Sequence, residues 1–193
     1  MKIGLFFGSF NPIHIGHMII ANHLAENSAL EQIWLVVTPH NPHKEKSSLL
    51  NDNQRLHMVH LATEEYTKIF PSDIEFKLPQ PNYTVNTLAY LKEKFPQHNF
   101  SLIMGEDNLN SLHKWKNYEF IIENYDIYVY PRLHSGDVNP QFTNHQKIHK
   151  TDTPIIELSS TLIRESIKNK KNVKPMLPEK VWEYIDHNNF YKK

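Results

Sequence analysis

The sequence predicts an α/β fold: an open, mostly parallel sheet with helices on both faces. Short continuous apolar runs, typical of strands buried on both faces, alternate along the chain with segments of helical periodicity. Most of these runs stop at or near a glycine or proline, residues that commonly end a strand. The alternation favours right-handed crossovers between neighbouring parallel strands.

Composition narrows the class of protein. The 193 residues suffice for one buried core, so we expect a single domain over residues 1–193. Lysine plus arginine equals aspartate plus glutamate, at 21 each, which argues against a nucleic-acid or membrane-binding surface. There are no cysteines, so disulfides and cysteine-ligated metals are excluded. No leader pattern or membrane-length apolar run is present, so the expected location is cytoplasmic.

Six strands and six helices are expected in chain order. The strands are residues 2–7, 33–37, 74–78, 100–104, 126–130 and, as the weakest run, 154–158. The helices are residues 13–27, 53–67, 84–95, 118–123, 160–169 and 178–186, with Pro96 ending one and Pro178 opening another. The polar segments 39–53 and 134–153 are expected to be loops.

Ligands of open α/β sheets bind beyond the carboxyl ends of the strands, which makes the first loop a candidate site. It reads GSFNPIHIGH from Gly8 to His17 and opens a helix. Gly8 permits a close backbone approach, and a helix start offers free amides and partial positive charge to phosphate. His14 and His17 lie on one helix face, where imidazolium groups could hydrogen-bond phosphate oxygens.

Histidine pairs with this spacing are common in the chain. Because 13 of the 193 residues are histidine, about one such pair is expected by chance. Two further pairs, His40/His43 and His57/His60, repeat the spacing and could in principle build a zinc site. No HExxH motif is present, and these four are interpreted as solvent-facing, so we expect no metal site. Only the strand, glycine turn and helix start distinguish the first pair.

A second helix start, rich in hydroxyls, follows the last apolar run. Ser159, Ser160 and Thr161 meet its free amides, and Arg164 lies one turn into the helix on the same face. A guanidinium can bind two phosphate oxygens at once. A plain cap with a surface arginine is the commoner meaning of such a string. Two similar helix starts in one chain nevertheless favour a polyphosphate that bridges them.

Both motifs, FFGSFNPIHIGH and SSTLIR, resemble the signature of the HxGH nucleotidyltransferase superfamily, which has a Rossmann-like fold. Four further strings, TPHNPHK, NYTVNTL, GEDNLNSLHKW and LPEKVWEYIDHNNFY, are similar to bacterial nicotinate-nucleotide adenylyltransferases. The likeness covers almost the whole chain and is weakest over residues 134–153. Phe7, Asn11 and Glu106 depart from the commoner pattern, in which glycine, aspartate and a small residue are frequent.

The resemblance implies transfer of the adenylyl group of ATP to nicotinate mononucleotide, with release of pyrophosphate, in NAD biosynthesis. It implies that His14, His17 and Arg164 are catalytic and stabilise phosphate charge. Mg²⁺ would be carried with ATP on phosphate oxygens and water. The implied ATP-binding residues are Gly8, Ser9, Phe10, His14, His17, Gly105, Asp107, Arg132, Ser159, Ser160, Thr161 and Arg164.

Acceptor binding is expected from other loops. Trp115 would stack on the pyridine ring, and the helix-start amides of Thr84 and Val85 would receive its carboxylate. Trp115 could instead be a core residue, and Lys44 a solvated lysine. The implied acceptor-binding residues are Asn11, Asn41, Lys44, Thr84, Val85 and Trp115.

Three other functions remain open on the sequence. Pantetheine-phosphate adenylyltransferases share both phosphate motifs but lack the NYTVNTL and GEDNLNSLHKW strings. A nicotinamide mononucleotide acceptor differs only by an amide in place of the carboxylate. A non-catalytic nucleotide-binding module would not need intact His14, His17 and Arg164. A homo-oligomer is compatible with the sequence but not predicted by it.

Overall fold

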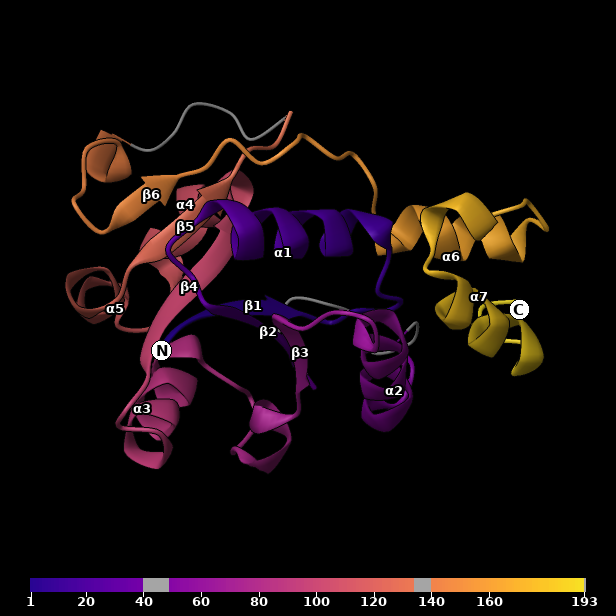
Figure 1. Cartoon of the computed structure of the whole chain (residues 1–193), viewed down its shortest axis with the longest axis horizontal. Helices are drawn as coiled ribbons and strands as arrows, with labels where there is room; N and C mark the ends of the chain where they lie inside the picture. Colours follow the sequence, from indigo (N-terminus) through magenta and orange to yellow (C-terminus); the bar gives the residue numbers. More distant parts are fainter. Residues whose placement is uncertain (40–48, 134–139, 193) are drawn as a thin grey trace.

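The computed structural model describes residues 1–39, 49–133 and 140–192. Six strands form one open sheet in the order β3-β2-β1-β4-β5-β6, and each of its strand pairs is parallel (Figure 1). This is the Rossmann strand order, so the predicted fold class is confirmed. The strands are β1 Lys2–Gly8, β2 Gln32–Val37, β3 Ile69–Ser72, β4 Asn99–Gly105, β5 Ile127–Tyr130 and β6 Ile148–Lys150.

Helices cover both faces of the sheet. The α-helices are α1 Ile15–Asn27, α2 Asp52–Thr63, α3 Thr84–Lys94, α4 Glu106–Ser111, α5 Tyr118–Asn124, α6 Ser160–Lys168 and α7 Glu179–His187. Short 3₁₀ turns are η2 Ile74–Lys77, η3 Leu112–Lys114, η4 Pro140–Phe142 and η5 Lys174–Met176. In the described part of the chain, no helix is long and apolar enough to cross a membrane.

Two apolar cores lie on opposite faces of the sheet because side chains alternate along each strand. Ile3 and Leu5 of β1 belong to the core under α3, α4 and α5, whereas Phe6 belongs to the core under α1, α2, α6 and α7. All three side chains are at most 3% exposed. The first expected strand is therefore buried on both faces, as its continuous apolar run indicated.

The predictions of a third strand at residues 74–78 and a sixth at residues 154–158 were wrong. Ile74–Lys77 form a 3₁₀ turn, with the Phe76 amide bonded to the Asp73 carbonyl, and the third strand is Ile69–Ser72 instead. Pro71 hid that strand from the sequence pattern, but β3 is an edge strand, where proline is tolerated. Residues 154–158 are not a strand, and β6 lies within the segment expected to be a loop. Helix α4 was not expected either.

The sheet reverses its strand order at β1, which pairs with both β2 and β4. The carboxyl ends of β1 and β4 therefore form the topological switch point, where this fold binds ligands. Figure 1 shows α6 and α7 beyond this end of the sheet, where β1 leads into α1. The first and last parts of the chain thus meet at the expected ligand edge.

Candidate active site

The β1–α1 loop is shaped by a phenylalanine that turns inward. Phe10 has a positive φ of 43° and its side chain is 1% exposed. A Cβ on Gly8 would lie 2.9 Å from the Phe10 ring, so position 8 has no room for a side chain. The Phe10 ring also meets the His17 ring edge-on, with centroids 5.1 Å apart. The buried Phe10 ring therefore packs against His17.

His14 and His17 stack at the start of α1. Their ring centroids are 3.7 Å apart and the ring planes differ by 22°. The backbone amide of His14 donates to Nδ1 of His17 at 3.2 Å. Because Nδ1 of His17 accepts a hydrogen bond, the neutral ring carries its hydrogen on Nε2. His17 is thereby held in the tautomer that can donate through Nε2.

The His14 ring is buried at this helix start. It is 4% exposed, and burial, with the positive charge of Arg132 as a second cause, lowers the pKa of His14 to about 4. Burial therefore favours the neutral ring at position 14 in the absence of a ligand. A Cβ on Gly16 would lie 3.1 Å from His14 Nδ1 and 3.0 Å from Ile156 Cγ2. Gly16 thus makes room for the His14 ring.

The α6 start is joined to the β1–α1 loop. Ser160 Oγ donates to the Pro12 carbonyl at 2.9 Å, and Arg164 Nη1 donates to the Asn11 carbonyl at 2.9 Å, across 148 and 153 residues of chain. Arg164 Nη2 also donates to Thr161 Oγ1 at 3.2 Å. The structure therefore brings together the two phosphate elements that were identified separately in the sequence.

Both helix starts offer free amides. Ser159 caps α6, since its Oγ accepts from the Leu162 amide at 3.1 Å. Within the described chain, the next two amides, those of Ser160 and Thr161, have no internal partner. The amides of Ile15 and Gly16 at the α1 start are equally unpaired. Two pairs of amides and two helix dipoles therefore favour anions at this edge.

The ends of β4 and β5 form a neighbouring surface. A Cβ on Gly105 would collide with Asp107 Oδ1 and lie 3.1 Å from the Tyr130 ring. Arg132 lies with its guanidinium carbon 5.2 Å from the centroid of the Tyr130 ring, and its Nε is 3.9 Å from Asp107 Oδ1. The Arg132 amide donates to Glu106 Oε2 at 3.1 Å. The three predicted residues Gly105, Asp107 and Arg132 thus share one surface beside the switch point.

The α3 start contains the predicted acceptor residues. In the described structure, the amides of Thr84 and Val85 have no internal partner. The Lys116 ammonium lies 4.6 Å from the centroid of the Tyr83 ring, so the segment after η3 meets the α3 start. Trp115 in that segment is half-buried and packs on the same core as the Val85 side chain. The structure therefore brings the segments of Thr84, Val85 and Trp115 together.

Other expected acceptor residues behave differently. The Asn11 side chain is 3% exposed, and its Oδ1 accepts from the Tyr191 hydroxyl at 2.7 Å and from the Leu50 amide at 3.3 Å. Asn11 therefore faces the protein. Asn41 and Lys44 lie outside the described residues, as do His40 and His43.

The remaining histidine pair is a surface feature. His57 and His60 lie on α2 and are exposed, which agrees with their interpretation as solvent-facing histidines. Among residues 1–39, 49–133 and 140–192, no group of three histidine, aspartate or glutamate side chains could hold a metal ion.

Arg55 was missed by the sequence reasoning. Its fully buried guanidinium donates to the Ser9 carbonyl at 2.5 Å, the Thr38 carbonyl at 3.0 Å and the Asp52 carboxylate at 2.5 Å. It therefore fixes the chain after β1 against the chain after β2. A signal was present in the sequence. Arg55 lies three residues before Met58, on the apolar face of α2, where an arginine is rarely buried unless it has partners.

Glu75 was missed as well. This carboxyl is 2% exposed, and Oε1 accepts from the Thr87 hydroxyl at 2.7 Å, one turn into α3. Burial raises the pKa of Glu75. The Asn82 amide group donates to the Glu75 carbonyl at 3.1 Å. Glu75 therefore fixes the α3 start, which is the predicted acceptor side, from beneath.

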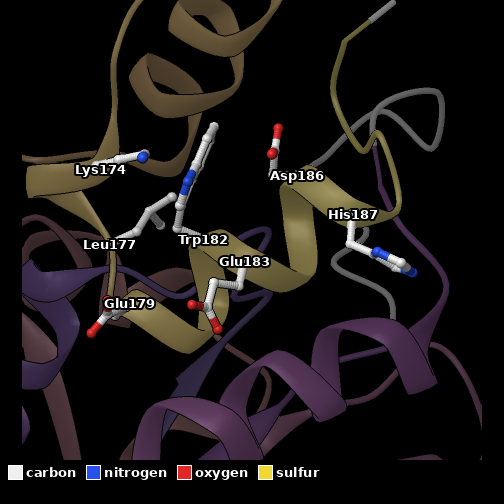
Figure 2. Close-up of a pocket in the computed structure, with 7 residues that line it drawn as sticks. All are labelled: Lys174, Leu177, Glu179, Trp182, Glu183, Asp186 and His187. Carbon is white, nitrogen blue, oxygen red and sulfur yellow. The ribbon is translucent and has the colours of Figure 1, made fainter.

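Open pockets lie elsewhere in the described part of the molecule. Figure 2 shows one of about 660 Å³ along α7, lined by Lys174, Leu177, Glu179, Trp182, Glu183, Asp186 and His187. Another, of about 650 Å³, lies between α1, α2 and the start of α7. Neither is lined by His14, His17 or Arg164. The candidate site is instead the edge of the sheet between three helix starts.

Known proteins resemble the chain in sequence and in fold. The cytidylyltransferase-like family model matches residues 5–166. A Flavobacterium psychrophilum protein named "Probable nicotinate-nucleotide adenylyltransferase" is 72% identical over 193 residues, which is 100% of both chains. A Cytophaga hutchinsonii protein of the same name is 47% identical over 191 residues, covering 99% of this chain and 98% of its own.

A solved structure extends the likeness to the fold. Plasmodium falciparum nicotinic acid mononucleotide adenylyltransferase, complexed with NaAD, matches with a TM-score of 0.82 and 19% identity, covering 99% of this chain and 97% of that one. At this identity the match shows the fold alone. The family model and the full-length relatives together show that this chain belongs to the cytidylyltransferase-like family and, within it, to the nicotinate-nucleotide adenylyltransferases.

Proposed function

We propose that the protein transfers the adenylyl group of ATP to nicotinate mononucleotide, giving nicotinate adenine dinucleotide and pyrophosphate, in NAD biosynthesis. The observation that carries the proposal is the meeting of two helix starts at one loop. Arg164 of α6 bonds the Asn11 carbonyl just ahead of His14 and His17 of α1. Because these elements come from the two ends of the chain, we propose one domain over residues 1–193.

The reaction is an in-line displacement at phosphorus. A phosphate oxygen of nicotinate mononucleotide forms a bond to the α-phosphorus of ATP, and the bond from that phosphorus to the bridging β-phosphate oxygen breaks. The electron pair of that bond leaves with pyrophosphate. A phosphate dianion is already a nucleophile, so the protein needs no general base. Its task is to position the groups and to stabilise charge.

The phosphate roles follow the geometry. His17 would donate through Nε2 to an α- or β-phosphate oxygen, with the amides of Ile15 and Gly16 beside it. Arg164 and the amides of Ser160 and Thr161 would hold the β- and γ-phosphates that leave. A bound polyphosphate would favour the protonated form of His14, which the empty fold disfavours.

The other predicted residues divide between the two substrates. Gly8 and Ser9 would let the backbone approach ATP, and Gly105, Asp107 and Arg132 would contact the adenosine side. Thr84, Val85 and Trp115 would bind the nicotinate ring and its carboxylate, together with Asn41 and Lys44. For Phe10 and Asn11 we propose supporting roles, since both side chains are buried.

Magnesium is the divalent ion that we propose for the reaction. The residues at the two helix starts are imidazoles, hydroxyls, amides and a guanidinium, which suit phosphate oxygens and not Mg²⁺. The ion would therefore arrive with ATP and neutralise charge on its phosphates, held mainly by phosphate oxygens and water.

The test is pyrophosphate release from ATP with each of three acceptors: nicotinate mononucleotide, nicotinamide mononucleotide and phosphopantetheine. We expect turnover with nicotinate mononucleotide and a mass-verified dinucleotide product. Release with phosphopantetheine alone, or no release above the rate with ATP alone, would overturn the proposal.

A further inference from the structure

The end of the chain returns to the active-site loop. After α7 ends at His187, the Phe190 amide bonds the Ile185 carbonyl at 3.1 Å. Asn189 and Tyr191 have positive φ values of 55° and 63°, which non-glycine residues rarely adopt. These two left-handed residues turn the last segment back towards the β1–α1 loop, 180 residues away in sequence.

The Tyr191 hydroxyl ends beside the two arginines of the site. It donates to Asn11 Oδ1 at 2.7 Å. Burial raises the pKa of Tyr191, which the nearby charges of Arg164 and Arg55 only partly offset. The phenol therefore stays protonated and remains a donor at neutral pH.

Asn11 connects this hydroxyl to Arg164. Its Oδ1 accepts from Tyr191 and from the Leu50 amide, while its main-chain carbonyl accepts from Arg164 Nη1 at 2.9 Å. The residue is 3% exposed, so its side chain is fixed by protein contacts and not by solvent. The side chain of Asn11 is thus tied to the end of the chain, and its carbonyl is tied to the phosphate-binding arginine.

We propose that Tyr191 is a positioning residue for Arg164 and acts through Asn11. The inference rests on the proposed function, in which Arg164 holds the phosphates that leave. An arginine side chain has several rotatable bonds, so a fixed acceptor is needed to aim its planar fork. The Asn11 carbonyl and Thr161 Oγ1 each take one guanidinium donor, and the geometry leaves further donors for phosphate. Loss of the Tyr191 hydroxyl would let the Asn11 carbonyl shift and misalign that fork.

The first test removes only the hydroxyl, in Tyr191→Phe. We expect the dissociation constant for ATP, measured by calorimetry without acceptor, to rise about three- to tenfold, the range that one hydrogen bond supports. KM for nicotinate mononucleotide should change less than about twofold, because the acceptor lies at α3. Since no turnover is needed, the ATP measurement remains interpretable even if the pyrophosphate assay refutes the proposed function.

Tyr184→Phe is the matched control. Tyr184 lies in the same C-terminal cluster, with its ring 5.5 Å from Phe190 and 4.6 Å from His57. In the described part of the chain, no hydrogen bond joins the Tyr184 hydroxyl to the β1–α1 loop, so ATP affinity should stay at the wild-type value. A similar loss in both variants would reduce Tyr191 to a general packing role and overturn the proposal.

The second test places Tyr191→Phe in an Arg164→Ala background. If Tyr191 acts through Arg164, its removal should cost less than about twofold in ATP affinity once the guanidinium is gone, because the two changes couple. Asn11→Ala should reproduce the loss seen in Tyr191→Phe and should not add to it. An equal loss in the wild-type and Arg164→Ala backgrounds, or unchanged ATP binding in Tyr191→Phe, would overturn the proposal.

Discussion

The phosphate side and the acceptor side of the site share a backbone device and differ in charge. On both sides a helix start presents two amides that have no partner among the described residues: Ile15 and Gly16 on α1, Thr84 and Val85 on α3. The phosphate side adds histidines and, from α6, Arg164. Helix α3 has no charged residue in its first turn, and the cation near its start is Lys116, which comes from the segment after η3 and lies 4.6 Å from the Tyr83 ring centroid. A polyphosphate carries several charges and the nicotinate carboxylate one, so the difference in charge within the helices matches the ligands proposed for each side.

The two sides also differ in what holds them from beneath. A buried cation, Arg55, and a tyrosine at the end of the chain support the β1–α1 loop. A buried acid, Glu75, supports the α3 start through the Thr87 hydroxyl. The comparison predicts that a substitution can weaken ATP binding without weakening acceptor binding, and the reverse.

The largest effect is expected from His17→Ala. Turnover should fall about 10²–10³-fold, because one preorganised donor to the transition state is lost. The fold should persist, since His17 is only partly buried and lies at the start of α1. Steady-state pyrophosphate release measures the loss. His60→Ala, on exposed α2, is the control and should keep full activity; wild-type turnover in folded His17→Ala would refute the role of His17.

The next effect is a pH dependence of stability from His14. Its folded pKa of about 4 lies below the ordinary value of 6.5, so the folded state favours the neutral ring. This contribution is complete above pH 6.5 and is lost as pH falls from 6.5 towards 4. It amounts to about 3 kcal/mol, at 1.36 kcal/mol per pKa unit.

Urea unfolding at pH 7 and pH 4.5 measures this contribution. His14→Gln should lose much less free energy of unfolding between the two pH values than the wild type does. His60→Gln, which removes an exposed histidine, should keep the wild-type difference. The same pH dependence in His14→Gln and wild type would show that His14 is not buried as a neutral ring.

A smaller and one-sided effect is expected from Thr87→Val. Loss of the hydroxyl leaves Glu75 without its bond to α3, so KM for nicotinate mononucleotide should rise about three- to tenfold with KM for ATP unchanged. Thr63→Val is the matched control: Thr63 is also buried and also loses a hydroxyl, which bonds the Val59 carbonyl at 2.9 Å on α2. Equal changes in acceptor KM for the two variants would contradict the separation of the sides.

The sequence pointed to the proposed binding groups more readily than to their supports. A strand–glycine–helix pattern singled out His14 and His17, and a hydroxyl-rich helix start singled out Arg164. The supports depend on contacts between distant segments: Tyr191 meets Asn11, and Arg55 meets Ser9. No local period encodes such pairs. The sequence also did not indicate the lowered pKa of His14, because that shift comes from burial in the folded chain.

The central claim is that the start of α3, which has no charged residue in its first turn, binds the carboxylate of the acceptor through its backbone amides. Helix-start amides favour an anion by roughly 0.3–2 kcal/mol, and an amide group would turn a donor towards those donors. The direct measurement is kcat/KM for nicotinate and nicotinamide mononucleotides under matched ATP and magnesium. We predict at least about a tenfold preference for nicotinate mononucleotide, equivalent to about 1.4 kcal/mol. Equal values, or a preference for the nicotinamide form, would contradict the claim.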